Sequence, residues 1–287
     1  MAAAPHVGRD QRRRLGSAST LLISATGAIG LLLAGCGTTS DVPVLGAERA
    51  EPVLPQLEIG GALPDGALDE VYDGPSFVAT AVDTELTQQD RTGGEVAVYE
   101  DAGDDQPSQT IANPVDGAGQ AVAPVVFLVD GDYDPNADWI EVNLPVRPNG
   151  STGWVRAEDV EITSHEFRIK VKLADHRIVV SDDGEVVLDA PAGVGTSQAP
   201  TPGGVFYTRS LIRSTNPAYG PYAYGLSGYS EVHETFGNGP GDIGIHGTAD
   251  AATVGADVSA GCIRLTNDDI ETLADILPLG VPVEIVA

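Results

Sequence analysis

Cysteine, aromatic side chains and basic residues are all scarce in this chain of 287 residues. It contains two cysteines, 5% aromatic residues, and 15 Lys and Arg against 42 Asp and Glu, which gives a formal charge of −27 at pH 7. A surface this acidic repels nucleic acid and anionic lipid headgroups. We therefore exclude nucleic acid as a partner and interpret the charge as the solvating surface of a secreted protein.

Glycine and proline, by contrast, are plentiful, with 35 and 20 copies. They indicate short strands and many turns rather than a helical bundle. Apolar residues make up 42% of the chain, which is enough to fill real cores, and the length suits one or two domains.

The N-terminus has the features of an export signal. Three arginines at 12–14 precede an apolar stretch over residues 15–33, which matches the n-region and h-region of a signal peptide. A retained transmembrane anchor is the alternative, because about 17–25 apolar residues suffice to span a bilayer. The two small residues before Cys36 resemble the bacterial lipobox and favour the first interpretation. By that resemblance, residues 1–35 are a lipoprotein signal peptide and Cys36 becomes the lipidated first residue.

Residues 36–76 have the composition of a flexible acidic tether. They hold five prolines, many acids and one base, Arg49, and their apolar residues follow neither a period of 2 nor one of 3.6. Such a segment cannot bury enough surface to offset the entropy of ordering. About 40 residues of flexible chain have a root-mean-square reach on the order of 35 Å, so the tether would lift the folded part off the membrane.

Residues 77–163 show short β-type runs separated by turns that are rich in Asp, Gly, Pro and Asn. The runs lie at 95–99, 125–129 and 139–142. Together with Trp139 and the later Gly-Trp154-Val segment, they resemble bacterial SH3-like barrels, which often occur beside cell-wall enzymes. We expect both tryptophans to pack in the core or at its rim rather than to stack on a ligand, and we assign this unit a positioning role.

The remainder of the chain predicts a mostly β unit with one helix. Alternation of apolar and basic residues over 167–173 predicts a strand, and Asp182-Asp183-Gly184 predicts the tight turn of a hairpin because Asp-Gly suits positive φ. Near the C-terminus, Thr266 or Asn267 caps a helix, and a last strand covers 281–286. The apolar face of that helix comprises Ile270, Leu273, Ala274 and Leu277.

Cys262 is the second cysteine, and no intrachain partner remains for it if Cys36 carries lipid. A lone thiol in an oxidising compartment is a liability unless its chemistry is used, so we expect a reactive role. A cysteine attacks acyl groups as its thiolate, and it needs a nearby base and donors for the oxyanion. Gly261 allows close approach of the backbone to a substrate, and its N–H is a candidate oxyanion donor.

Five histidines are candidates for the base. His6 leaves with the signal peptide, and we expect His165 and His176 to be solvated. His246 ends a small apolar run 16 residues before the cysteine and is the first choice, with His233 as the second.

These pieces together resemble a known family. The motifs are His246-Gly247, a spacing of 16 residues, then Ser259-x-Gly261-Cys262-x-Arg264 and a capped helix. In this order they are similar to the L,D-transpeptidase catalytic domain of the YkuD family, and Thr-Pro-Gly-Gly-Val-Phe at 201–206 is similar to that family's TPxGxF stretch. The resemblance implies a YkuD-like β-sandwich with one packed helix over residues 167–287, preceded by the small SH3-like barrel over 77–163.

The resemblance also implies a role for each motif residue. Cys262 is the nucleophile, His246 is the general base, and the carbonyl of Gly247 orients the imidazole. Ser259 shapes the turn or makes a local hydrogen bond, and Arg264 either holds a substrate carboxylate or braces the loop. The sequence departs from the family pattern at residue 260, where Ala replaces the common His.

Tyrosines are concentrated just before the His-Gly motif. Five of the eight fall between residues 206 and 230, and the loop at 216–224 is rich in Gly and Pro, as a substrate lid would be. The family has a comparable Pro-Tyr segment here, which favours Tyr222 as a wall of the pocket. The alternative is that these rings pack beneath the loop.

The implied reaction consists of two acyl transfers and needs no metal or organic cofactor. The thiol attacks the diamino-acid carbonyl of a peptidoglycan stem tetrapeptide and releases D-Ala, and a side-chain amine of a second stem then captures the thioester as a 3→3 cross-link. Donor and acceptor stem peptides are the expected partners. We expect a monomer that its lipid anchors to the outer face of the bacterial cytoplasmic membrane, facing the wall.

Two other functions stay open at this point. Water as the acceptor would make the protein an L,D-carboxypeptidase that trims stem peptides. The missing histidine at position 260 would also suit a non-catalytic wall-binding lipoprotein, although the cysteine and His246 are intact. A papain-like protease fits poorly, because the cysteine precedes the histidine in that family and follows it here.

Overall fold

The computed structural model describes residues 74–82, 94–113, 124–236 and 239–287, all of which fall within one compact unit of the chain. The expected signal peptide and Cys36 lie outside these residues, as does nearly all of the expected tether. In the described ranges, no helix is both long and apolar enough to cross a membrane.

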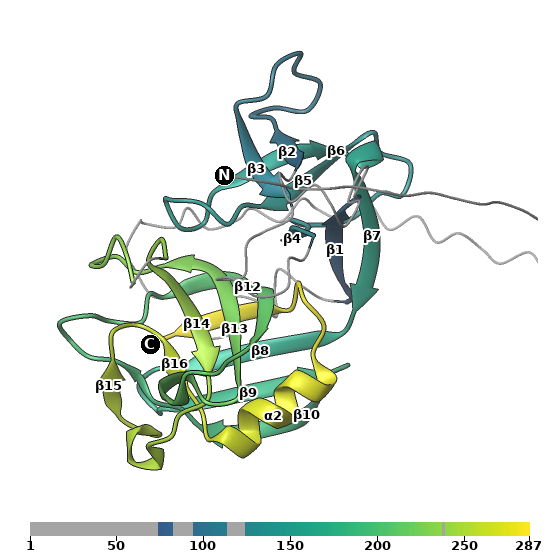
Figure 1. Cartoon of the computed structure of the whole chain (residues 1–287). Helices are drawn as coiled ribbons and strands as arrows, with labels where there is room; N and C mark the ends of the chain where they lie inside the picture. The colour runs from purple at the N-terminus through teal and green to yellow at the C-terminus, as the bar shows by residue number, and fades with distance from the viewer. Residues whose placement is uncertain (1–73, 83–93, 114–123, 237–238) are drawn as a thin grey trace, which may run out of the picture. The chain divides into compact units, whose positions relative to one another are not determined.

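The first described part of the chain, up to His165, consists of short antiparallel strands (Figure 1). Strands β4 (Val126–Leu128), β1 (Ser76–Ala81) and β7 (Val160–His165) form one sheet in that order. Two separate two-stranded sheets accompany it: β2 (Gly94–Val98) with β3 (Gln109–Asn113), and β5 (Trp139–Asn143) with β6 (Thr152–Arg156). The predicted runs at 95–99, 125–129 and 139–142 are therefore present as strands.

These strands enclose a core of their own, in which Val98, Phe127 and Val142 are fully buried. The tryptophans lie at its rim and are half-buried, as predicted. The Trp139 ring meets Tyr99 edge to face at 4.8 Å, and the Arg156 guanidinium stacks 5.5 Å from the Trp139 ring centre.

The rest of the chain forms an eight-stranded sheet with the order β10-β9-β8-β17-β12-β13-β14-β16. Its strands are β8 (Phe167–Lys172), β9 (Arg177–Asp182), β10 (Glu185–Pro191), β12 (Gly204–Arg213), β13 (Tyr222–Tyr229), β14 (Asp242–His246), β16 (Ile263–Arg264) and β17 (Pro282–Val286). Pairing is antiparallel except for β8 with β17 and β14 with β16. A short parallel pair, β11 (Val194–Gly195) with β15 (Asp257–Ser259), lies outside this sheet.

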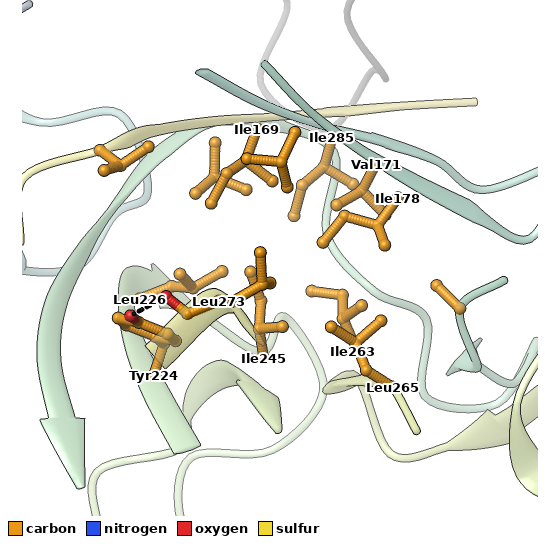
Figure 2. Close-up of a cluster of buried hydrophobic side chains, with 14 of the residues drawn as sticks. Ile169, Val171, Ile178, Tyr224, Leu226, Ile245, Ile263, Leu265, Leu273 and Ile285 are labelled. Atoms are coloured by element: carbon orange, nitrogen blue, oxygen red, sulfur yellow. Dashed lines mark hydrogen bonds between the residues drawn. The ribbon is translucent and has the colours of Figure 1, made fainter. Parts of the chain in front are cut away.

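The sheet curls so that its two halves face each other across one core (Figure 2). Side chains of β8, β9 and β17, such as Ile169, Ile178 and Ile285, point toward those of β13, β14 and β16, such as Leu226 and Ile245. This arrangement confirms the predicted mostly β sandwich.

Helix α2 (Asn267–Ile276) closes the core and is the one α-helix in the described ranges. The Thr266 hydroxyl accepts a hydrogen bond from the Asp269 N–H at 3.2 Å, which settles the predicted cap in favour of Thr266. Ile270 and Leu273 are fully buried, and the Tyr224 hydroxyl on β13 donates to the Leu273 carbonyl at 3.1 Å (Figure 2). The cap fixes the start of α2, and these contacts hold the helix against β13.

Candidate active site

The candidate site is built on two neighbouring parallel strands, β14 and β16. Ile245 pairs with Ile263, and both are fully buried in the core. Because side chains alternate along a strand, His246 and Arg264 point to the opposite face. Cys262, the residue before β16, lies on that same face beside Gly244. The predicted nucleophile and base are therefore diagonal neighbours on one face of the sheet.

The imidazole of His246 is held by a single short hydrogen bond. Its Nδ1 lies 2.6 Å from the carbonyl oxygen of Gly247. A carbonyl only accepts, so Nδ1 carries the proton and Nε2 keeps its lone pair in the neutral ring. Burial lowers the pKa of His246 to about 4, with the Arg264 charge acting in the same direction. The ring is therefore neutral at pH 7 and can accept a proton at Nε2.

The Cys262 thiol is free and partly accessible. Burial raises its pKa, and the Asp242 carboxylate adds to that effect. A backbone hydrogen bond with Gly244 and the charge of Arg264 act in the opposite direction. The resting site at neutral pH thus pairs a thiol with a neutral imidazole, not a thiolate with an imidazolium.

Ser259 and Gly261 build the turn that presents the cysteine. The Ser259 hydroxyl donates to the Cys262 carbonyl at 2.6 Å and accepts from the Gly261 N–H at 3.1 Å. Gly261 has φ = +122°, which other residues rarely adopt. Since its N–H is occupied within the turn, Gly261 does not offer the oxyanion donor that its position suggested. The N–H of Cys262 itself donates to no acceptor among the described residues.

Arg264 carries a buried donor beside the thiol and the imidazole. Its Nε has no hydrogen-bond partner in the part of the chain that the structure describes. Its backbone is fixed, because its N–H and carbonyl both bond to Gly193 at 2.8 Å. An unpaired buried donor costs free energy, and a ligand that supplied an acceptor would remove that cost.

The structure does not bring Tyr222 to this face. On β13, Tyr224 and Leu226 point into the core, and Tyr222 packs against the same core. Its hydroxyl accepts a hydrogen bond from Arg213 at 2.5 Å. Alternation along the strand leaves Ala223 and Gly225 on the side that carries Cys262.

Tyr219 supplies the aromatic ring instead, a residue that was not predicted for the site. It ends the short helix η2 (Pro217–Tyr219), its ring centre lies 4.7 Å from that of His246, and 41% of the residue is exposed. Burial raises the pKa of the Tyr219 phenol, and the charge of the Cys262 thiolate acts in the same direction. The Gly- and Pro-rich loop that carries Tyr219 was the available signal.

The loop at 216–221 is pressed against the His-Gly motif. The Ala249 N–H donates to the Pro217 carbonyl at 3.1 Å, and the Gly247 N–H donates to the Tyr222 carbonyl at 3.3 Å. Gly220 has φ = +61°, and a Cβ there would lie 2.7 Å from the Gly247 Cα. Only glycine lets the loop come this close, so Gly220 sets the position of Tyr219.

A second residue that sequence reasoning missed is Asp242, at the start of β14. It shares the face of Gly244 and His246, and its carboxylate pairs with Arg209 at 2.6 Å. Ala260, at the position of the missing histidine, is exposed.

The other histidines take part in contacts of their own. His233 packs on Phe236 with 5.1 Å between ring centres, and His176 lies 2.8 Å from Asp257. His165 is half-buried rather than solvated, and burial lowers its pKa to about 4. Within the described ranges, no three His, Cys, Asp or Glu side chains gather in a way that could hold a metal ion.

Comparison with solved structures gives matches over part of the chain. An L,D-transpeptidase of Mycobacterium smegmatis is 18% identical, with coverage of 57% of this chain and 91% of that one and a TM-score of 0.35. A mutant L,D-transpeptidase of Enterococcus faecium is 24% identical, with coverage of 42% and 49% and a TM-score of 0.34.

Sequence comparison gives a match over the segment that carries the site. Over 120 residues the chain is 38% identical to a protein of Bacillus subtilis and 37% identical to one of Bacillus licheniformis, both named for L,D-transpeptidase activity as YkuD. Each match covers 42% of this chain and 65% of the relative, so the chain spans about 65% of the length of these curated proteins. A family model described as the L,D-transpeptidase catalytic domain, YkuD, matches residues 166–285. Residues 166–285 of this chain are therefore similar in sequence to the L,D-transpeptidase catalytic domain of the YkuD family.

Proposed function

We propose that this protein is an L,D-transpeptidase that forms 3→3 peptidoglycan cross-links through a thioester on Cys262. The observation that carries the proposal is the placement of Cys262 and His246 on one face of adjacent parallel strands, with Nδ1 of His246 bound to the Gly247 carbonyl. This arrangement is the nucleophile, base and orienting group that acyl transfer by a cysteine requires.

In the first transfer, the Cys262 sulfur attacks the carbonyl of the stem-peptide diamino acid while the thiol proton passes to Nε2 of His246. The imidazolium then returns this proton to the nitrogen of the departing D-Ala. The C–S bond forms first and leaves a tetrahedral oxyanion, and the C–N bond breaks when this oxyanion collapses, so the acyl group remains on Cys262 as a thioester. The Cys262 N–H, free of other partners in the described residues, is the donor we assign to the oxyanion.

In the second transfer, an amine of another stem peptide attacks the thioester, gives up a proton to His246 and regenerates the thiol. The buried Nε of Arg264 supports a role in holding a carboxylate of the donor peptide, because a carboxylate would supply the acceptor that this donor lacks. If water entered in place of the amine, the same intermediate would be hydrolysed and the protein would act as an L,D-carboxypeptidase.

A mass measurement tests the proposal. The purified protein is incubated with a carbapenem, an acylating β-lactam, and its intact mass is compared with that of Cys262→Ala. We expect one covalent adduct on the wild type and none on the variant. Absence of an adduct, with Cys262 still open to iodoacetamide, would contradict catalysis and favour a wall-binding protein. Stem tetrapeptides with and without an acceptor stem then separate cross-linking from hydrolysis.

The location of the protein is also a proposal. Residues 1–35 would direct export, Cys36 would carry the lipid, and 36–76 would tether the folded units at 77–163 and 167–287 to the outer face of the bacterial cytoplasmic membrane. The lipobox-like sequence supports this placement. We expect labelled fatty acid to be incorporated by the wild type but not by Cys36→Ala when both are expressed in a bacterial host.

A further inference from the structure

The described residues up to His165 form the first β region. Its loop between β5 and β6 is hydrogen-bonded to the connection between strands β13 and β14. Arg147 donates from Nη1 to the Ser230 carbonyl at 2.8 Å, and from Nη2 to the carbonyls of His233 at 3.0 Å and Pro240 at 3.4 Å. Ser230 and His233 lie in the part of the connection that follows β13, and Pro240 lies in the part that leads into β14. One guanidinium therefore bridges the two parts.

Three hydrogen bonds and a stacking contact hold the same loop against Tyr229, the last residue of β13. The Asn149 amide donates to the Tyr229 carbonyl at 2.9 Å and accepts from the Tyr229 N–H at 2.8 Å. The Tyr229 hydroxyl donates to the Pro145 carbonyl at 2.5 Å, and Arg147 stacks 4.8 Å from the centre of the ring. Tyr229 is only 8% exposed, and its hydroxyl bond to Pro145 is buried, whereas the two bonds with Asn149 are partly buried.

The two ends of the connection are also bonded to each other, next to the carbonyls that Arg147 binds. The Ser230 N–H donates to the Gly241 carbonyl at 2.9 Å, which joins its two ends. The Ser230 hydroxyl accepts from the N–H groups of Val232 and His233. Gly241 has φ = +78°, and a Cβ there would lie 2.5 Å from the His233 carbonyl oxygen. The residues that lead into β14 are therefore fixed in position at Gly241.

The residue that follows Gly241 couples this arrangement to the candidate site. Asp242 begins β14, lies on the face of His246 four residues further on, and acts electrostatically on the Cys262 thiol. Arg209 on β12 holds its carboxylate at 2.6 Å. A shift of the connection would move Asp242, and with it the edge of the face on which the acyl donor must lie.

We propose that Arg147 is a positioning residue for the active site, which holds the two ends of the β13–β14 connection in place and thereby fixes Asp242 at the edge of the face that carries Cys262 and His246. This inference rests on the proposed function of Cys262. Arg147 lies outside the segment matched by the family model, residues 166–285. The first β region would accordingly complete the catalytic unit, with Arg147 acting through the connection and touching no reacting atom.

The test compares Arg147→Ala and Arg147→Lys with Arg156→Ala in the otherwise unchanged protein. Arg156 is a matched control because it also belongs to the first β region and stacks on aromatic rings, Tyr99 and Trp139. We expect Arg147→Ala to lower kcat/KM for a stem tetrapeptide by about tenfold to a hundredfold, the scale of a small misplacement of a substrate. Lys, which can satisfy fewer of the three carbonyls, should recover part of the loss.

Two readouts distinguish positioning from general damage. Alkylation of Cys262 by iodoacetamide should still go to completion in Arg147→Ala, because the turn that presents the thiol remains folded. Hydrogen exchange should accelerate in residues 230–236 of this variant and stay unchanged in Arg156→Ala.

The inference is overturned if Arg147→Ala retains wild-type kcat/KM, or if its loss is matched by Arg156→Ala. If Arg147→Ala does not fold, Arg147→Lys and Asn149→Ala carry the same comparison. If the wild type forms no acyl-enzyme at all, the proposed function fails. Hydrogen exchange at 230–236 then still shows whether Arg147 holds the connection, and the positioning role in catalysis falls with the function.

Discussion

At the scale of single residues, the pKa values of His246 and Cys262 are set mainly by the burial of both side chains. His246 is 4% exposed and its pKa is lowered to about 4, while burial raises the pKa of Cys262. Both shifts favour the neutral forms. In the proposed reaction, proton transfer from thiol to imidazole would therefore occur during attack on the substrate, when the acyl group and the oxyanion donor are present.

This resting state predicts the pH dependence of the thiol. Since the thiolate is the reacting form and its pKa is raised, alkylation of Cys262 by iodoacetamide should increase steadily toward alkaline pH, with no plateau between pH 5 and 8. Replacing Asp242 by Asn removes a negative charge that disfavours the thiolate. Asp242→Asn should therefore shift the profile to lower pH, and a profile that moves to higher pH would contradict this electrostatic account.

Tyr219 provides a second prediction at this scale. Its ring packs on His246 at 4.7 Å, and burial is the main cause of the low histidine pKa. Tyr219→Ala should expose the imidazole and raise its pKa from about 4 toward the usual 6.5, as followed by NMR titration of the ring protons. Tyr219→Phe should leave the pKa low because the ring remains. Tyr222→Ala is the control, and an equal rise in that variant would show that Tyr219 has no particular role.

At the scale of elements, the strands and helix near the site have clear local signals, but the register that brings them together does not. Alternation predicts β8, Asp-Gly predicts the β9–β10 turn at Asp183 and Gly184, and the cap predicts α2, and all are present. The pairing of β13 is irregular between Gly225 and Tyr229, and that of β12 between Thr208 and Ser210. A shift of one residue reverses which face a side chain occupies.

Because the face of a side chain depends on register, only site residues marked by a motif could be predicted from the sequence. Cys262 and His246 are identified by motif and spacing, whatever the register. Tyr222 and Tyr219 are both plausible on composition, and only the register of β13 shows that Tyr222 points toward the core. The hydrogen bond from Arg147 to Ser230 joins residues 83 positions apart, and no local sequence pattern predicts a contact of that kind.

The cap of α2 is an element whose contribution can be measured. The Thr266 hydroxyl accepts from the Asp269 N–H and donates to the Asp269 carboxylate at 2.6 Å. We expect Thr266→Ala to lower the free energy of unfolding in urea by about 1 kcal/mol. Thr272→Ala is the control, because this exposed hydroxyl bonds back to the Asp268 carbonyl within the helix and caps nothing. A loss as large in the control would show that the cap is not the cause.

At the scale of the whole described unit, a third apolar cluster joins the strands before His165 to those after it. Val78, Val126 and Leu128 from the first region pack with Tyr207 of β12, and Leu279 lies against them. Gly280 completes the contact, because a Cβ there would lie 2.4 Å from a methyl group of Val78. The two regions share buried surface in addition to the bonds of Arg147 and Asn149, so we expect them to unfold together.

Leu128→Ala tests this coupling. Leu128 is fully buried, and its truncation should lower the free energy of unfolding by about 2–5 kcal/mol. Both tryptophans lie in the first region and Cys262 in the second, so tryptophan fluorescence and thiol accessibility report on the two regions separately. In the variant both probes should move to lower urea concentration and still coincide. Val187→Ala, at a 43% exposed position, should shift neither. If the fluorescence transition moved while that of the thiol stayed in place, the two regions would be independent, and the first could not serve as a rigid support for the site.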